Sequence, residues 1–256
     1  MEMVRDGAIY PSLRGKRVIV SGGGSGIGAA LVEAFSAQDA KVGFVDIEHE
    51  ESGKLCERLA DSKHSPIFRH CDVTRTDDYV ATLRELMEAL GGCDVLLNNA
   101  ASDERHEIAD VTPAEWDRRM AVNLKHQFFA AQQVAPGIAS EGGGSIVNFG
   151  SISWHLGLER LTIYQTAKAA IEGLTRSLAR ELGRDGIRVN CIVPGNVQTP
   201  RQERWYTPEG EAEIVAAQCL DGRIQPRDVA AMALFLASDD ARFCTGHNYW
   251  VDAGWR

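Results

Sequence analysis

Residues 17–28 read RVIVSGGGSGIG, an apolar run that passes directly into a glycine-rich turn. Apolar residues then recur at the three- and four-residue spacing typical of a helix. A strand, a glycine turn and a helix in this order let the backbone approach a pyrophosphate and point a helix N-terminus at its charge. The spacing G-x-x-x-G-x-G fits from Gly22, whereas G-x-G-x-x-G from Gly22 fails at Ile27. A flexible turn is the alternative interpretation. The residues predicted to hold the phosphates are Gly22, Gly24, Ser25, Gly26, Ile27 and Gly28.

A second predicted strand, residues 41–46, ends on the carboxylate of Asp46. In a doubly wound sheet this position hydrogen-bonds the ribose diol of an adenine nucleotide. A carboxylate there repels the 2′-phosphate of NADP, and neither Ile47 nor Glu48 supplies a cation to attract one. The pattern therefore predicts NAD as the cofactor, with an ordinary turn aspartate as the alternative.

Further strands are predicted at residues 66–70, 94–100 and 144–149, and helical periodicity is found between them. This alternation predicts an α/β fold: a single-domain Rossmann-type doubly wound parallel sheet of about seven strands with helices on both faces. We expect residues 1–14 to be a leader and 15–256 to form one dinucleotide-binding and catalytic domain. Within that domain, residues 196–225 are expected to cover the substrate.

The composition limits the possible partners. The chain has 256 residues and a net charge of −9, with 27 basic and 36 acidic residues and no basic run that could follow a nucleic acid. The six cysteines are widely spaced, no Cys/His grouping suits a metal, and no apolar run approaches the roughly 18–20 residues of a membrane span. We expect a cytoplasmic protein without nucleic-acid, membrane or metal partners.

Tyr164 and Lys168 carry the predicted chemistry. The apolar spacing of residues 162–183 predicts a helix, which places these two side chains one turn apart on the same face. A cation beside a phenol favours the phenolate and so suits a general base that takes a proton from an alcohol. A surface tyrosine beside a solvated lysine is the alternative. Ser151 follows the predicted strand 144–149 and can share the site.

Asn123 lies within residues 115–139, which are predicted to form one or two helices. An asparagine is unfavourable inside a helix unless its side chain has a specific role. We expect Asn123 to disturb the backbone hydrogen bonds and to hold a water molecule.

Together these motifs resemble the short-chain dehydrogenase/reductase family over residues 15–256. The resemblance rests on the glycine turn, Asp46, Asp72-Val73, Asn98-Asn99-Ala100, Asn123, Ser151, Tyr164-x-x-x-Lys168 and the segment 194–199. Two positions depart from the family pattern: Ser21 replaces the usual threonine, and Ala101 replaces a glycine where backbone lies close to the cofactor.

The resemblance implies a role for each site residue. Tyr164 is expected to be the base, Lys168 to lower its pKa and hold the nicotinamide ribose, Ser151 to steady the reacting oxygen, and Asn123 to anchor a water on the proton path. Beyond the glycine turn, the implied NAD contacts are Asp46, Asp72, Val73, Asn99, Tyr164, Lys168, Pro194, Val197 and Thr199.

The resemblance also implies a homotetramer. One interface would use the helix face that carries Ala169, Glu172, Gly173 and Arg176, and the other would use residues 249–251.

The loops expected to meet the substrate are polar with interleaved aromatic residues, which suits a sugar better than a steroid. Their sequence resembles the sugar dehydrogenases of the family and implies oxidation of the anomeric carbon of an aldopyranose, with D-xylose as the first candidate. L-arabinose, D-galactose, another polyol, or a non-catalytic NAD-binding sensor or scaffold are the alternatives. The candidate substrate contacts are Asp103, Arg105, Ser151, Trp154, His155, Asn196, Gln202 and Tyr206.

Overall fold

The computed structural model describes residues 7–203 and 207–255, which fold around one seven-stranded parallel sheet with the strand order β3-β2-β1-β4-β5-β6-β7. Every neighbouring pair of strands runs parallel, so the predicted doubly wound sheet is confirmed. The strands are β1 (Arg17–Ser21), β2 (Lys41–Asp46), β3 (Ile67–His70), β4 (Val95–Asn98), β5 (Gly144–Phe149), β6 (Ile187–Pro194) and β7 (Asn248–Val251).

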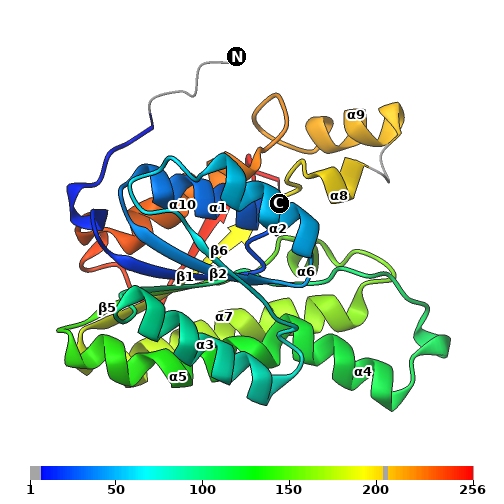
Figure 1. Cartoon of the computed structure of the whole chain (residues 1–256). Coiled ribbons are helices and arrows are strands. Elements are labelled where there is room, and N and C mark those ends of the chain that lie inside the picture. Colours follow the sequence, from blue (N-terminus) through cyan, green and yellow to red (C-terminus); the bar gives the residue numbers. More distant parts are fainter. Residues whose placement is uncertain (1–6, 204–206, 256) are drawn as a thin grey trace.

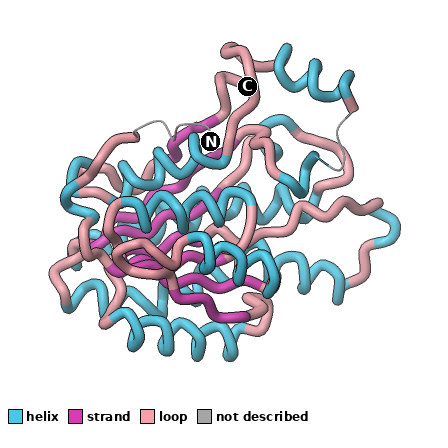
Figure 2. The backbone as a smooth tube through the Cα atoms, turned by 45° about the horizontal axis from the view of Figure 1, so that its top comes forward, coloured by secondary structure: helices cyan, strands magenta, loops and turns pink. Residues whose placement is uncertain are grey.

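Helices cover both faces of the sheet (Figure 1). One face carries α1 (Gly26–Ala37), α2 (His49–Arg58) and α10 (Pro226–Ala237), and the other carries α3 (Thr76–Leu90), α5 (His126–Ser140) and α7 (Thr162–Leu182). Two apolar cores result, one on each side. The central strands are continuous apolar runs because both of their faces are buried. Figure 2 shows the strands side by side in the middle of the molecule, with helices around them.

The backbone of the glycine turn packs so closely that it leaves no room for a side chain. Gly22 has a φ of 68°, and a Cβ atom on Gly28 would lie 1.7 Å from the Gly22 carbonyl oxygen. Such a contact is impossible for any other residue, so glycine at both positions brings the start of α1 directly against the end of β1.

The segment around Asn123 departs from a regular α-helix. Helix α4 (Pro113–Met120) continues through a π-helical stretch, η3 (Ala121–Lys125), into α5. The disturbance of the backbone hydrogen bonds expected at Asn123 is thus present. π-Helical turns inside helices are frequent at functional sites.

The predicted boundaries agree with the structure to within a few residues. Helix α2 ends at Arg58, and β3 begins at Ile67 rather than at residue 66. Within the stretch expected to be a leader, the short helix η1 (Pro11–Leu13) buries the side chain of Leu13 in the core.

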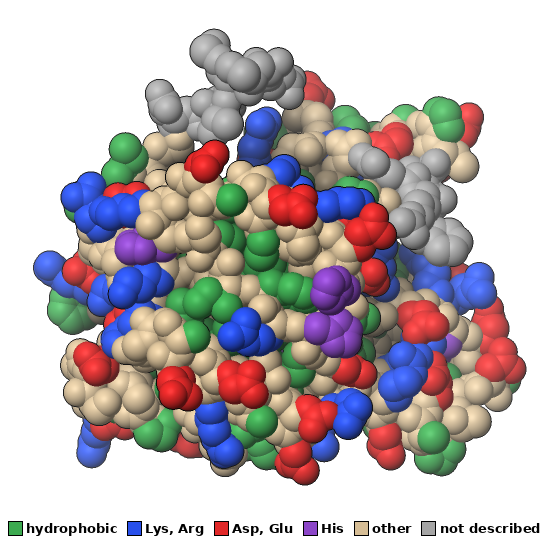
Figure 3. All heavy atoms as spheres, in the orientation of Figure 1, with side chains coloured by type: hydrophobic (Ala, Val, Ile, Leu, Met, Phe, Trp, Pro, Cys, Tyr) green, Lys and Arg blue, Asp and Glu red, His purple; other side chains and the backbone are tan. Residues whose placement is uncertain are grey.

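Two short helices, α8 (Pro200–Glu203) and α9 (Pro208–Ala216), and the bridge between Val197 and Ile224 lie in the region between β6 and α10. Acidic and basic side chains are intermixed on the face shown in Figure 3. Within residues 7–203 and 207–255, no helix combines the length and the apolar character needed to cross a membrane. The six cysteines are free thiols.

Candidate active site

Helix α7 places Lys168 against the end of β5. Lys168 as a whole is 2% exposed, and its ammonium donates a hydrogen bond of 2.7 Å to the carbonyl oxygen of Phe149 and lies 5.4 Å from the ring centroid of Tyr164. Burial lowers the pKa of Lys168 to about 8, because a charged ammonium is poorly solvated there. The two side chains are therefore neighbours, as the helix prediction required.

The environment of Tyr164 differs from the sequence prediction in one respect. Burial raises the pKa of its phenol, and the negative charge of Asp103 raises it further. A hydrogen bond with Ser151 and the positive charge of Arg201 lower the pKa but do not outweigh burial. In the protein alone, burial therefore changes the pKa of Tyr164 more than the neighbouring positive charge does.

Ser151 lies just beyond β5 and meets both Tyr164 and its own loop. Its hydroxyl oxygen accepts a hydrogen bond of 3.1 Å from the backbone N–H of Ser153 and lies 2.9 Å from the Ser153 hydroxyl oxygen. Strand β5 and helix α7 thereby bring Ser151, Tyr164 and Lys168 together at the carboxyl end of the sheet, where ligands of doubly wound folds bind.

Asn123 is fully buried and joins the π-helical stretch to the loop after β4. Its side-chain amide donates to the carbonyl oxygens of Ser102 and Arg119, each at 3.0 Å, and its Oδ1 accepts from the N–H of Ser102 at 2.8 Å. The observed contacts of its side chain are thus to protein backbone, and they fix the loop that borders the site.

The glycine turn forms a cradle suited to a dinucleotide. The N-terminus of α1 has no side-chain cap from Ser25, so its backbone N–H groups remain suited to an anion. A Cβ atom on Gly26 would lie 3.2 Å from Thr199, which shows that the loop after β6 closes over this helix end. Asn99 donates to the carbonyl oxygens of Ser21 and Gly22 and so fixes the turn.

Both carboxylate oxygens of Asp46 accept backbone hydrogen bonds, from Gly24 at 2.7 Å and from Glu48 at 2.9 Å. These two hydrogen bonds show that the Asp46 side chain stabilises the turn. A carboxylate oxygen has a further lone pair, so the geometry also suits a ribose hydroxyl.

The other residues expected to meet the cofactor lie at or after strand ends. Asp72 is exposed and accepts hydrogen bonds from the backbone and hydroxyl of Thr74, while Val73 is buried. Pro194 ends β6, Val197 is buried, and Thr199 is half-buried. These residues follow β3 and β6, so all of them stand at the carboxyl edge of the sheet.

Several predicted substrate residues have partners within the chain. Asp103 forms a 3.1 Å ion pair with Arg201, Arg105 donates to the carbonyl of Glu159, and Asn196 accepts from Arg223. Gln202 donates its backbone N–H to Thr199. Trp154 and His155 both contact Glu172. Tyr206 lies outside the described residues.

The sequence did not predict the contacts of Arg201 with Asp103 or of Glu172 with Trp154 and His155, because neither Arg201 nor Glu172 belongs to a local motif.

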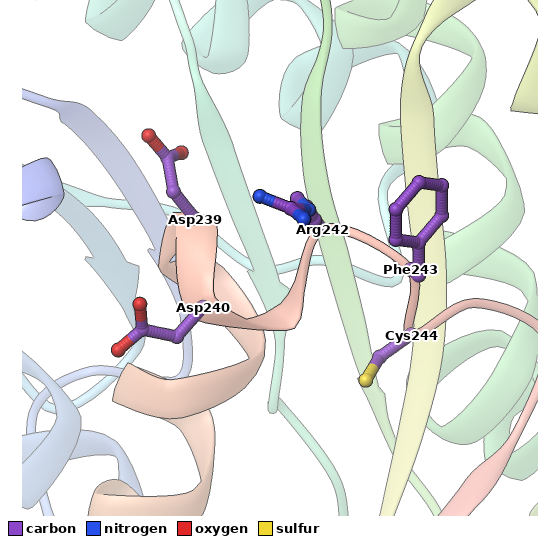
Figure 4. Close-up of a pocket in the computed structure, with 5 residues that line it drawn as sticks. All are labelled: Asp239, Asp240, Arg242, Phe243 and Cys244. Atoms are coloured by element: carbon purple, nitrogen blue, oxygen red, sulfur yellow. The ribbon is translucent and has the colours of Figure 1, made fainter.

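A separate surface hollow lies far from this site (Figure 4). It lies between α10 and β7, at the amino edge of the sheet, and Phe243 there is 89% exposed; its lining residues are Asp239, Asp240, Arg242, Phe243 and Cys244. The side chains of Phe243 and Cys244 point in opposite directions, so they do not converge on one point. Over the described ranges, no three His, Cys, Asp or Glu side chains are grouped as metal ligands.

Three features are typical of a short-chain dehydrogenase/reductase: the parallel sheet, the glycine cradle, and the grouping of Ser151, Tyr164 and Lys168. The chain belongs to that family. It matches the family profile described as "Enoyl-(Acyl carrier protein) reductase" over residues 22–256. It is 61% identical over 249 residues to the D-xylose 1-dehydrogenase of Caulobacter vibrioides, covering 97% of this chain and 99% of that protein.

Two further relatives extend the comparison. The chain is 47% identical to the "Probable galactose dehydrogenase GalD" of Rhizobium meliloti, covering 96% of each protein. A solved 7α-hydroxysteroid dehydrogenase in complex with NADH and 7-oxo glycochenodeoxycholic acid shares 30% identity and a TM-score of 0.91, covering 96% of each chain. The chain is therefore an oxidoreductase of a family that binds a nicotinamide cofactor.

Proposed function

We propose that this protein oxidises D-xylose to D-xylonolactone with NAD as the hydride acceptor. The observation that carries the proposal is the convergence of Ser151, Tyr164 and Lys168 at the end of β5, in a chain 61% identical to a D-xylose 1-dehydrogenase. Bound NAD would accept the hydride from C1 of the sugar.

The residues of the chain handle the proton and the charge. Tyr164 takes the proton from the O1 hydroxyl of the ring hemiacetal, and Ser151 donates a hydrogen bond to the same oxygen. Lys168 is the proposed cation that stabilises the phenolate, and the proposed reaction requires the pKa of Tyr164, which burial raises in the protein alone, to be lower in the complex with NAD and sugar. Asn123 holds the loop after β4 in place and is the proposed anchor of a water on the proton path.

The cofactor is held mainly by backbone. The glycine cradle from Gly22 to Gly28 takes the pyrophosphate, Asp46 the adenosine ribose, and Asp72 with Val73 the adenine. Asn99, Lys168 and the segment from Pro194 to Thr199 complete the nicotinamide end. The Asp46 carboxylate favours NAD over NADP through repulsion of the 2′-phosphate.

The sugar is recognised through its hydroxyl groups. A site that pairs each hydroxyl rejects an epimer by about 1–3 kcal/mol, because the epimer leaves a buried donor or acceptor unsatisfied. Asp103, Asn196 and Gln202 remain the proposed contacts; Asp103 acts on Tyr164 through its charge, and Gln202 adjoins Arg201, which does the same. D-galactose is a second candidate, supported by the 47% identity to a probable galactose dehydrogenase.

A panel of aldoses assayed for NADH formation tests the proposal. We expect the highest kcat/KM with D-xylose, and a higher value for D-glucose, D-galactose or a secondary alcohol would contradict that assignment. The variant Tyr164→Phe should lose at least ~10²-fold in kcat while NAD affinity stays within about threefold, because only the transferable proton is removed. A smaller loss would show that Tyr164 is not the base.

We also propose a homotetramer. Ala169, Gly173 and Arg176 lie on an exposed or half-exposed face of α7, and residues 249–251 form the half-buried edge strand β7. Glu172, expected on the same interface, instead binds residues of its own chain. Light scattering during size exclusion should give about four times the 28.0 kDa of the chain. A stable monomer would refute the tetramer.

A further inference from the structure

One carboxylate on the active-site helix joins three separate segments of the chain. Oε1 of Glu172 accepts hydrogen bonds from the indole N–H of Trp154 at 2.8 Å and from Nε2 of His155 at 2.9 Å. Its Oε2 accepts a hydrogen bond from the side-chain amide of Asn248 at the start of β7. The Glu172 side chain is only 13% exposed, so water does not readily replace these hydrogen bonds.

An aromatic stack reinforces the cluster. The ring centroids of Trp154 and His155 lie 3.6 Å apart with planes 35° apart, and His155 meets Trp250 of β7 at 4.3 Å. The indole N–H is the single donor of a tryptophan side chain. Because Glu172 takes that donor, Trp154 supports the site in this geometry instead of donating a hydrogen bond to a sugar hydroxyl.

The cluster around Glu172 is connected to Ser151 through a short helix. Trp154 and His155 belong to the short helix α6 (Ser153–Leu156), and the first residue of that helix binds the Ser151 hydroxyl. The N–H of Ser153 donates to the Ser151 oxygen at 3.1 Å, and the Ser151 hydroxyl donates to the Ser153 hydroxyl oxygen at 2.9 Å, so two bonds to one residue fix the position of the Ser151 oxygen. The loop is anchored on its other side by the bond from the Ile152 N–H to the carbonyl of Pro194.

We propose that Glu172 is a positioning residue for Ser151: it holds α6 against α7 and β7 so that Ser153 fixes the Ser151 oxygen beside Tyr164. The inference rests on the proposed dehydrogenase reaction. The hydrogen bonds of Glu172 within the described residues go to Trp154, His155 and Asn248 and not to Tyr164 or Lys168, so its effect on catalysis passes through α6. A displacement of about 1 Å at a reacting group can cost ~10²-fold in rate, so the contribution is measurable.

Kinetics of matched variants test the proposal. Glu172→Ala should lower kcat by at least about tenfold, with NAD affinity within about twofold of wild type, because the cofactor cradle is untouched. Glu172→Gln keeps one oxygen for Trp154 and His155 and should retain at least about a third of the wild-type kcat. Glu88→Ala, at an exposed glutamate of α3, is the control and should match wild type.

A double-mutant cycle separates positioning from general packing. In a Ser151→Ala background, Glu172→Ala should change kcat by less than about twofold, since the hydroxyl to be positioned is gone. Equal losses in both backgrounds would overturn the proposal. Where Glu172→Ala fails to fold, Trp154→Phe removes the indole N–H while keeping an aromatic ring, and should lower kcat about two- to fivefold, again only when Ser151 is present.

The test distinguishes this inference from the proposed function. All variants are assayed with the alcohol that the wild type oxidises best. The double-mutant cycle can therefore be interpreted even when that substrate is not D-xylose. Additive losses in an active enzyme overturn the positioning role alone. A wild type that oxidises no sugar or polyol overturns the proposed function and the positioning role together.

Discussion

The buried ammonium of Lys168 is bonded to the carbonyl oxygen of Phe149 at 2.7 Å. This bond ties the helix that carries Tyr164 to the strand whose end leads into Ser151. An ammonium has three N–H donors, so the Phe149 bond uses one and fixes the direction of the others. Tyr164, Lys168 and Ser151 thereby share one rigid framework.

The variant Lys168→Met should separate stability from activity. Methionine has a similar volume and removes a charge that is costly to bury, so the melting temperature should equal or exceed that of the wild type. Turnover should fall by at least ~10²-fold and the KM for NAD should rise, because the cation and the ribose contact are both lost. Calorimetry and steady-state kinetics measure the two effects, and Lys125→Met, at an exposed lysine, is the control. A stabilised variant with normal turnover would remove Lys168 from the mechanism.

Asp46 should set the cofactor preference. The wild type should favour NAD over NADP by at least about tenfold in kcat/KM, and Asp46→Ala should narrow that ratio. The variant should also lose stability, because the backbone N–H groups of Gly24 and Glu48 lose their acceptor. Asp61→Ala, at an exposed aspartate, should change neither property. Equal use of both cofactors by the wild type would leave Asp46 as a turn residue only.

The sheet and the core of the site follow from local patterns. The apolar runs of β1 and β2, the glycines that close the first turn, and the helical spacing of Tyr164 and Lys168 each act over a few residues. Such patterns are readable because the backbone geometry of a strand, a tight turn or one helical turn limits which residues fit. The family resemblance added Ser151 and Asn123 to the same site.

The contacts that the sequence did not predict join distant segments. Glu172 was expected on an intersubunit face, since helix periodicity says which face a residue occupies but not which loop packs there. Arg201 of α8 pairs with Asp103 in the loop after β4, and no spacing rule relates them. The raised pKa of Tyr164 in the protein alone could not be predicted for a similar reason, because burial depends on the whole fold.

His126 should make the protein sensitive to acid. Burial and the positive charge of Lys168 lower its pKa to about 3, against about 6.5 in an unfolded chain. Below about pH 6.5 the unfolded state therefore binds a proton that the folded state does not, so the free energy of unfolding falls as the pH falls toward about 3. The loss should approach about 1.4 kcal/mol per pH unit from this residue.

Urea unfolding at a series of pH values, with the protein concentration fixed, measures this slope. His126→Phe keeps a ring against Tyr79 and should show a shallower decline below about pH 6.5, whereas His247→Gln, at an exposed histidine, should follow the wild type. Identical slopes for wild type and His126→Phe would mean that other groups cause the acid sensitivity.

Asp103 and Arg201 should tune the pH dependence of the reaction in opposite directions. Their ion pair links the loop after β4 to α8, and both charges act on Tyr164, one raising and the other lowering its pKa. Because kcat/KM rises with pH as the base loses its proton, Asp103→Asn should shift the profile to lower pH and Arg201→Gln to higher pH. The Ser151 hydrogen bond and the nearby Lys168 ammonium remain in both variants.

The shifts should be small, since the side chains of Asp103 and Arg201 are 37% and 55% exposed. Exposed pairs contribute about 0.2–1 kcal/mol, which corresponds to about 0.1–0.7 pH unit. The double variant should return the profile close to that of the wild type, and high salt should reduce each single shift. Profiles of kcat/KM for the sugar, measured at saturating NAD in low and high salt, provide the comparison. Shifts of the same sign in both single variants would show that loop displacement, and not charge, governs the effect on Tyr164.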